Sequence, residues 1–234
     1  MQEIDTLVKE TVTATERLPD GTSEKTLSIM ELITSGGIGG NLVMGTLGIL
    51  SIFAVYILIE RYSAIKKASV EEQSFLQSIR NFVEAKDIEA AKTLCKNTDS
   101  PISRMIEKGV NRIDKPMTDI SAAIENQGKL EVFKMENNLA NLATISGAAP
   151  MIGFLGTVIG MIVAFHEMAS AGGNIDVAML SQGIYTAMVT TVAGLVVGII
   201  AFIAYNYLVS KIDKVVFMLE AKTTDFLDLL HHNE

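Results

Sequence analysis

Residues 139–165 read LANLATISGAAPMIGFLGTVIGMIVAF, a block without Asp, Glu, Lys, Arg or His. A helix rises about 1.5 Å per residue, so a block of this length, about 40 Å, is more than long enough to cross the hydrocarbon core of a bilayer, which is about 30 Å thick. Two other uncharged blocks, at 42–59 and 183–210, are also long enough to cross a membrane. We therefore predict an all-α, polytopic membrane protein with three transmembrane helices.

The orientation of these spans follows from the basic residues. Of the 19 lysines and arginines, 13 lie between Arg61 and Lys134, and the 166–183 loop has none. The positive-inside rule then puts the region between the first two spans, and the C-terminus, in the cytoplasm. The predicted organisation is an extracytoplasmic N-terminus with a short interfacial helix (1–40), transmembrane helix 1 (41–60), a cytoplasmic helical region (61–138), transmembrane helix 2 (139–165), a periplasmic loop (166–183), transmembrane helix 3 (184–210) and a cytoplasmic C-terminal helix (211–234). The first residues lack the basic and apolar regions of a secretory signal, so we do not expect one to be cleaved.

Two of the predicted helices extend far beyond the membrane. From Met117 to Phe165 the only proline is Pro150, which indicates one helix of about fifty residues. Residues 184–230 also favour one continuous helix. In the cytoplasmic region, Ser69 with Glu72 forms a capping-box pattern, and Asp87 is a second expected N-cap. Turn residues at 97–101 and 114–116 separate further short helices.

Composition excludes several classes of function. The net charge of −8 argues against nucleic-acid binding, which needs a basic surface. The single cysteine, Cys95, permits neither an intrachain disulfide nor a cysteine-based zinc site, and we expect it to be a small structural residue. We find no phosphate loop, no nucleophile–base arrangement and no metal-ligand spacing. We predict no enzyme activity, no metal and no organic cofactor.

Small and hydroxylated residues form a stripe on each of the second and third spans. At about 100° per residue, one face of each span collects them, while bulky aliphatic residues occupy the rest. On the second span the stripe comprises Ser146, Ala149, Pro150, Gly153, Gly156, Thr157, Gly160 and Ala164; on the third it comprises Ala187, Thr190, Thr191, Gly194, Gly198, Ala201 and Tyr205. The first span shows no such segregation, which suits an outer, lipid-facing position.

Two interpretations of these stripes remain open. Small residues allow close helix packing, whereas hydroxyls on one face indicate a polar lumen or an enclosed partner helix. We assign Gly153, Gly156, Gly160, Gly194 and Gly198 to close packing, Pro150 to a helix kink, and Thr157, Thr191, Thr190, Ser146 and Thr186 to a pore lining or proton pathway.

The second and third spans contain no acid that could carry a proton. An ionisable group inside a membrane is energetically costly and usually functional. Its absence from both spans therefore limits how this chain could carry protons. If the protein uses a proton gradient, the titrating acid must come from a partner. His166 and Glu167, at the outer end of the second span, are more simply explained as an interfacial pair in contact with water.

Two motifs carry a family resemblance. Residues 146–158 (SGAAPMIGFLGTV) and 183–195 (GIYTAMVTTVAGL) resemble the two signatures of the ExbB/TolQ/MotA proton-channel family. The resemblance implies a homopentameric ring around two copies of an ExbD- or TolR-like single-span subunit, which supplies a membrane aspartate. It also implies that Thr157 and Thr191 face the lumen beside that aspartate. Many ExbB-like members have a glutamate where this sequence has Thr186, so a role for that glutamate is not transferred.

Further details of the resemblance point to the most similar subgroup. Three spans favour ExbB or TolQ over the flagellar stator subunit, and an N-terminus of about 40 residues favours ExbB. The implied function is proton-driven energisation of TonB-dependent outer-membrane transport from the bacterial inner membrane, with protons as the coupling ion and membrane lipids bound. The alternatives are a TolQ-like subunit acting with a TolA-like protein in the Tol-Pal envelope system, a stand-alone channel or carrier, and a passive membrane scaffold.

Overall fold

The computed structural model describes residues 37–69, 73–170 and 177–232, and within these ranges it has helices and no strand. The all-helical prediction is therefore confirmed for the described part of the chain. The short interfacial helix expected near the N-terminus lies outside the described residues. The helices are α3 (Gly37–Ala68), α4 (Gln73–Glu84), α5 (Ile88–Asn97), α6 (Pro101–Val110), α7 (Met117–Glu136), α8 (Leu139–Ser170) and α9 (Val177–His232).

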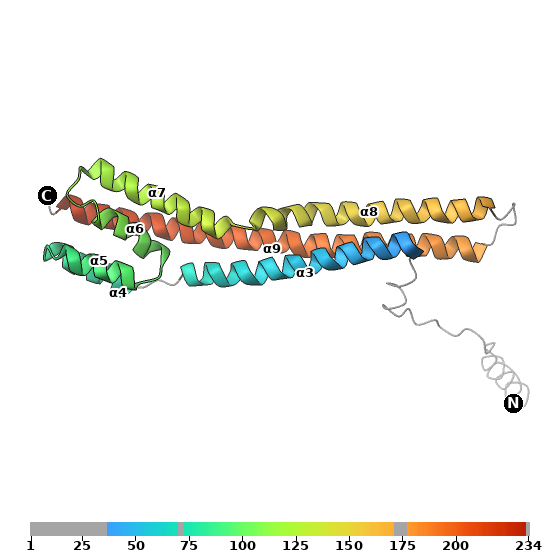
Figure 1. Cartoon of the computed structure of the whole chain (residues 1–234), viewed down its shortest axis with the longest axis horizontal. Coiled ribbons are helices and arrows are strands. Elements are labelled where there is room, and N and C mark those ends of the chain that lie inside the picture. The colour runs from blue at the N-terminus through green and yellow to red at the C-terminus, as the bar shows by residue number, and fades with distance from the viewer. Residues whose placement is uncertain (1–36, 70–72, 171–176, 233–234) are drawn as a thin grey trace, which may run out of the picture.

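Helix α9 runs along the whole molecule, and α3 and α8 lie alongside parts of it (Figure 1). In this arrangement α3 and α8 both pack against α9. The stretches that are long and apolar enough to cross a membrane are Gly39–Ala68, Met117–Ser170 and Leu180–His231, the second of which includes the α7–α8 junction. Three membrane-crossing helices agree with the three uncharged blocks of the sequence.

The continuous helix predicted over 184–230 is confirmed, because α9 spans 56 residues from Val177 to His232 without a break. Beyond the apolar block its side chains Ile212, Leu219 and Phe226 are buried. Helices α4 to α7 gather around this end of α9 (Figure 1). One helix thus joins the membrane region to a small lobe of short helices, which we call the α4–α7 lobe.

The single helix predicted from Met117 to Phe165 is wrong. The chain leaves the helical path at Asn137–Asn138, where α7 ends and α8 begins. Asn138 has a φ of 64°, in the left-handed region, which asparagine tolerates better than most residues. The prediction considered only proline as a helix breaker and overlooked two consecutive asparagines.

Capping residues set the limits of the short helices in the α4–α7 lobe. Asp87 accepts a hydrogen bond from the Ala90 amide (3.0 Å), as predicted for the start of α5. Ser100 and Ser103 form a reciprocal capping box at α6, with Ser100 at the N-cap and Ser103 in the first turn. The Ser69 hydroxyl donates to the Ile65 carbonyl (2.8 Å) at the end of α3, and Glu72, its expected capping partner, lies outside the described residues.

The core of this lobe is built from large aliphatic side chains. Ile79, Ile106 and Ile124, from α4, α6 and α7, are almost completely buried. Cys95 is buried in the same cluster, as expected for a structural residue. Burial raises the pKa of its thiol to about 12, with the nearby charge of Glu107 acting in the same direction. The thiol is therefore neutral at ordinary pH.

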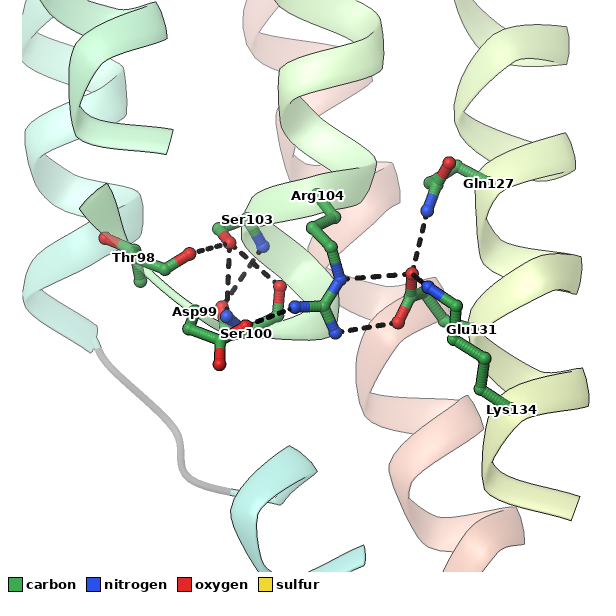
Figure 2. Close-up of polar contacts among 8 residues, drawn as sticks. All are labelled: Thr98, Asp99, Ser100, Ser103, Arg104, Gln127, Glu131 and Lys134. Atoms are coloured by element: carbon green, nitrogen blue, oxygen red, sulfur yellow. Dashed lines mark hydrogen bonds and ion pairs between the residues drawn. The ribbon is translucent and has the colours of Figure 1, made fainter. Parts of the chain in front are cut away.

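A buried carboxylate joins α6 to α7. Only 2% of the Glu131 side chain is exposed, and Figure 2 shows it surrounded by Arg104, Gln127 and Lys134. Both carboxylate oxygens accept from Arg104 (3.1 and 2.8 Å), while Gln127 and Lys134 donate to Oε1 (2.7 and 2.9 Å). Burial acts to raise the pKa of Glu131, but these hydrogen bonds and the charges of Arg104 and Lys134 hold it below its usual value. Glu131 therefore remains ionised.

The same helix α7 is tied to the end of the first membrane helix. The Arg61 side chain is buried and pairs with the adjacent Glu60. One of its guanidinium nitrogens also donates to the Lys134 carbonyl (2.9 Å). This contact holds the C-terminal end of α7, just before the Asn137–Asn138 break, against α3.

Candidate functional site at the α8–α9 interface

The two small-residue stripes face each other within one chain. A Cβ placed on Gly153 of α8 would lie 2.7 Å from the Thr190 carbonyl oxygen and 3.0 Å from the Gly194 Cα of α9. A Cβ on Gly194 would lie 2.6 Å from the Ala149 carbonyl oxygen. These distances are shorter than real side chains tolerate, so glycine is what allows the two backbones to approach so closely.

The other predicted packing glycines lie along the same contact. Gly156 faces the Thr190 side chain, and Gly160 faces Ala187, with an added Cβ 2.8 Å from the Ala187 Cβ. Gly198 packs on the Pro150 ring, where an added Cβ would lie 2.6 Å from Cγ. Helix α8 continues through Pro150, and the ring fits against α9 because Gly198 has no side chain. The kink expected at Pro150 stays a prediction.

Three threonine hydroxyls share the Gly153 carbonyl about halfway along α8. The hydroxyl oxygens of Thr157 on α8 and Thr191 on α9 are hydrogen-bonded to each other. The Gly153 carbonyl lies within 3.3 Å of both hydroxyls, and the Ala187 carbonyl is also 3.3 Å from the Thr157 oxygen. The two helices thus share a small polar centre, which we call the threonine pair (Thr157 and Thr191).

The hydrogen bonding of the threonine pair can run in either direction. A hydroxyl has one proton to donate and two lone pairs that accept. When Thr157 donates to Thr191, the Thr191 proton can go to the Gly153 carbonyl; when Thr191 donates, Thr157 has the Gly153 and Ala187 carbonyls available. Each arrangement leaves a lone pair that can accept from a third group, such as a water molecule or a protonated acid.

Thr190 has a different environment. It is only 2% exposed, and its hydroxyl lies 2.7 Å from the Ala187 carbonyl and 3.2 Å from the Gly153 carbonyl. Thr157 and Thr191, by contrast, are half-buried at the edge of the interface. In the single chain, Thr190 therefore has the contacts of a packing residue, and its place in a proton pathway stays a prediction.

Ser146 and Thr186 are not joined to the threonine pair by a hydrogen bond. The Ser146 hydroxyl donates to the Ala143 carbonyl (2.7 Å) and the Thr186 hydroxyl to the Gln182 carbonyl (2.8 Å), each within its own helix. Both side chains are half-buried. Their predicted role as pore-lining residues stays a prediction.

Two contributors to the site were missed in the sequence. The Gly153 carbonyl is an acceptor for all three threonines, and no side-chain pattern reveals a backbone acceptor. Gly183 extends the packing contact, because an added Cβ would lie 2.7 Å from the Ala164 Cβ. That glycine lies four residues before Ala187 on the same helical face, so the stripe could have been continued to include it.

The opposite faces of α8 and α9 carry bulky apolar side chains that no other described residue covers. Exposed examples are Phe154 and Ile162 on α8, and Val192 and Ile199 on α9. Such surfaces require lipid or other protein around them. The small-residue faces are thus internal to the chain, and the bulky faces are its outer surface.

Comparison with known proteins agrees with this architecture. A model of the MotA/TolQ/ExbB proton channel family matches residues 97–221, more than half of the chain. The chain is 28% identical over 187 residues to a putative biopolymer transport protein ExbB homolog of Methanothermobacter thermautotrophicus, covering 80% of this chain and 64% of that one. It is 24% identical over 215 residues to the Tol-Pal system protein TolQ of Pseudomonas aeruginosa, covering 87% and 93%.

A shorter match is closer in sequence. The biopolymer transport protein ExbB of Helicobacter pylori is 40% identical over 79 residues, which cover 34% of this chain and 54% of the relative. The family match includes both signature motifs and the helices that hold the threonine pair. The chain belongs to the MotA/TolQ/ExbB proton channel family.

Proposed function

We propose that the chain is an ExbB-like stator subunit of a proton-driven motor in the bacterial inner membrane. Five copies form a ring around a dimer of an ExbD-like single-span protein, with the N-terminus periplasmic and the C-terminus cytoplasmic. The complex couples the proton motive force to TonB-dependent outer-membrane transport. The chain acts without metal or organic cofactor and is not an enzyme.

The observation that supports this proposal is the threonine pair in spans that have no acid. Residues 139–165 and 183–210 contain no Asp, Glu, Lys, Arg or His, yet two hydroxyls from different helices meet at the edge of their interface. Hydroxyls can orient water or accept from a protonated acid, but they do not themselves charge and discharge at physiological pH. A partner's membrane carboxylate supplies the missing proton carrier.

Valine substitution of the threonine pair tests this role. Valine keeps the branched shape of threonine and removes the hydroxyl, so the variants T157V and T191V should assemble normally and lose most of the activity driven by the proton motive force. Thr144→Val is the matched control, because Thr144 lies on α8 and its hydroxyl donates only to Ala140 of its own helix. Activity is measured in a host strain that lacks its own subunit of this kind.

Complex formation with the partner is measured in the same cells. Normal assembly with unchanged activity in both T157V and T191V would contradict a pathway role for the pair. Loss of activity in T144V to the same degree would show that the effect is not specific to the interface.

A TolQ-like subunit of the Tol-Pal envelope system is the second candidate. The match to the Pseudomonas aeruginosa TolQ protein covers 93% of that protein, whereas the match to the Methanothermobacter thermautotrophicus ExbB homolog covers 64% of that one. Complementation of strains that lack either system separates the two: restored outer-membrane transport favours ExbB, and restored envelope integrity favours TolQ.

A stand-alone channel is distinguished by reconstitution. The proposal expects the purified chain in vesicles to carry little proton flux without a single-span partner, because neither span contains an acid to exchange protons. Strong flux from the chain alone would favour the channel, and function that persists after the proton gradient is dissipated would favour a passive scaffold.

A further inference from the structure

Two tyrosines stack where α3 and α9 leave the apolar layer. The rings of Tyr62 and Tyr207 have centroids 6.3 Å apart and planes inclined by 27°. Helix α3 carries no charge before Glu60, and α9 carries none before Lys211. Tyr62 follows the first charged residues of α3, and Tyr207 lies four residues before the first charge of α9. The stacked pair therefore lies where both helices change from apolar to charged sequence, which is the level of the lipid headgroups. Tyrosine is enriched at that level in membrane proteins.

A lysine follows each tyrosine at the same spacing. Lys66 lies four residues after Tyr62, and Lys211 lies four residues after Tyr207, so each lysine is on the same helical face as its tyrosine. Helices α3 and α9 run in the same direction (Figure 1). The Lys211 ammonium lies 5.6 Å from the centroid of the Tyr207 ring, which places this charge beside the aromatic pair.

These lysines have no acidic partner among the described residues. The lysines that form ion pairs in the α4–α7 lobe are Lys92, Lys129 and Lys134. Neither Lys66 nor Lys211 forms an ion pair with a described carboxylate. The nearest acid along α3, Glu60, is paired with the buried Arg61. This surface therefore presents two ammonium groups that are not in an ion pair, together with Tyr62 and Tyr207, which are 43% and 45% exposed.

An apolar track continues from the tyrosines into the membrane. Ile59 and Val55 precede Tyr62 by three and seven residues, and Ile203 and Ile200 precede Tyr207 by four and seven. All four side chains are exposed, and helical spacing puts them on or beside the tyrosine-bearing faces. A free phosphate ion could use the lysines but not this track, whereas a phospholipid matches both.

We propose that Tyr62, Lys66, Tyr207 and Lys211 form a binding site for the phosphate headgroup of an anionic phospholipid, whose acyl chains lie along the adjacent apolar track. The site does not depend on proton coupling, but it requires that this face of α3 and α9 meets lipid and is not covered by a neighbouring copy in the proposed ring. A basic residue near an anionic membrane surface contributes roughly fivefold to affinity. Removal of both lysine charges should therefore weaken binding about 25-fold.

The test uses the purified full-length protein in detergent and native mass spectrometry, with phosphatidylglycerol and phosphatidylcholine of identical acyl chains as probes. The double variant K66Q/K211Q should lose most phosphatidylglycerol binding. The matched control K67Q/K214Q removes the same charge from exposed lysines beside them on the same helices, and should lose no more than about threefold. Phosphatidylcholine should bind the wild-type protein weakly.

Equal losses in the two double variants would overturn the proposal in favour of diffuse charge attraction, and so would an absence of loss in K66Q/K211Q. Equal binding of phosphatidylcholine would show that the headgroup charge is not recognised. Displacement of phosphatidylglycerol by excess inorganic phosphate would show a site for the free ion.

A second pair of variants tests the aromatic part. Y62F/Y207F keeps both rings and should retain phosphatidylglycerol binding, whereas Y62L/Y207L should weaken it severalfold while the helix content measured by circular dichroism stays unchanged. Equal binding by these two variants would contradict a contribution from the stacked rings, whatever the lysine variants show.

Discussion

The α8–α9 interface and the α4–α7 lobe are both made of helices, but they pack in opposite ways. In the lobe, large side chains such as Ile79, Ile106 and Ile124 fill the space between helices. At the α8–α9 interface, Gly153 and Gly194 allow the two backbones to come into contact. Water drives the burial of large apolar side chains, whereas in lipid that drive is absent and close van der Waals packing replaces it.

The two regions also differ in the polar groups that they bury: the lobe contains a charged group, and the α8–α9 interface contains neutral ones. The lobe buries an ionised carboxylate, Glu131, surrounded by Arg104, Gln127 and Lys134 (Figure 2). Among side-chain polar groups, the α8–α9 interface holds only hydroxyls. These hydroxyls form hydrogen bonds with backbone carbonyls and with each other. A charge is tolerated in the lobe because its partners surround it, and the interface has no side chain that could serve as such a partner.

The largest expected effect is a substitution at the closest backbone contact. Gly153→Val should separate α8 from α9 and lower the free energy of unfolding by about 3 kcal/mol, because its side chain would overlap the Thr190 carbonyl and Gly194. Gly147→Val is the matched control, since nothing lies within 4 Å of an added Cβ there. Unfolding in detergent is followed by circular dichroism; equal losses in both variants would contradict glycine-mediated packing.

In the lobe, the corresponding change is Glu131→Gln. It removes the charged acceptor of Arg104 and Lys134 and should cost about 2 kcal/mol of lobe stability, the usual range for hydrogen bonds to a charged group. Glu125→Gln, on the same helix and paired with Lys129 at the surface, should change stability little. The variants are compared by thermal unfolding. An equal effect of both would contradict a larger contribution of the buried Glu131 cluster to the stability of the lobe.

Acidification should weaken the lobe through the same residue. The pKa of Glu131 in the folded protein lies below its ordinary value, so its contribution is full above the unfolded pKa of about 4 and is lost as the pH falls through the lowered folded pKa. Between about pH 5 and about pH 3, the wild-type protein should lose more stability than Glu131→Gln. Parallel decreases in the two proteins would assign the acid sensitivity to other carboxylates.

The smallest effect is expected at the break between α7 and α8. In the Asn138→Ala variant, alanine must adopt the left-handed conformation, which it tolerates less well than asparagine does. The free energy of unfolding should fall by about 1 kcal/mol. Asn138→Gly fits that conformation and should be close to neutral. Thermal unfolding of both variants measures the difference. A more stable Asn138→Ala would indicate that a continuous helix is available to this sequence.

The short helices show which local signals are reliable. Asp87 and Ser100 begin α5 and α6 because a side-chain oxygen can satisfy a free backbone amide wherever the helix starts. The break at Asn137–Asn138 was missed because asparagine can adopt the left-handed conformation but does not require it. Whether the chain uses that tolerance depends on packing, including the Arg61 contact with the Lys134 carbonyl.

The stripes on α8 and α9 illustrate a similar limit at the site. Helical periodicity placed the glycines and threonines on one face of each helix, because side-chain direction follows residue spacing. It left open whether these faces pack together or line a lumen. In the single chain the glycines pack, Thr190 is buried between the helices, and the threonine pair lies at the edge.

The amino-acid sequence alone is enough to identify a helical protein with three membrane-crossing segments, because a long uncharged block in lipid must satisfy its own backbone hydrogen bonds, and a helix does so. It also determined that the second and third spans carry no acid. Only the tertiary structure decided which hydroxyls meet, where the long second helix breaks, and that Tyr62 stacks on Tyr207. These features depend on contacts between residues far apart in the chain, and spacing along one helix contains no information about the distance to another.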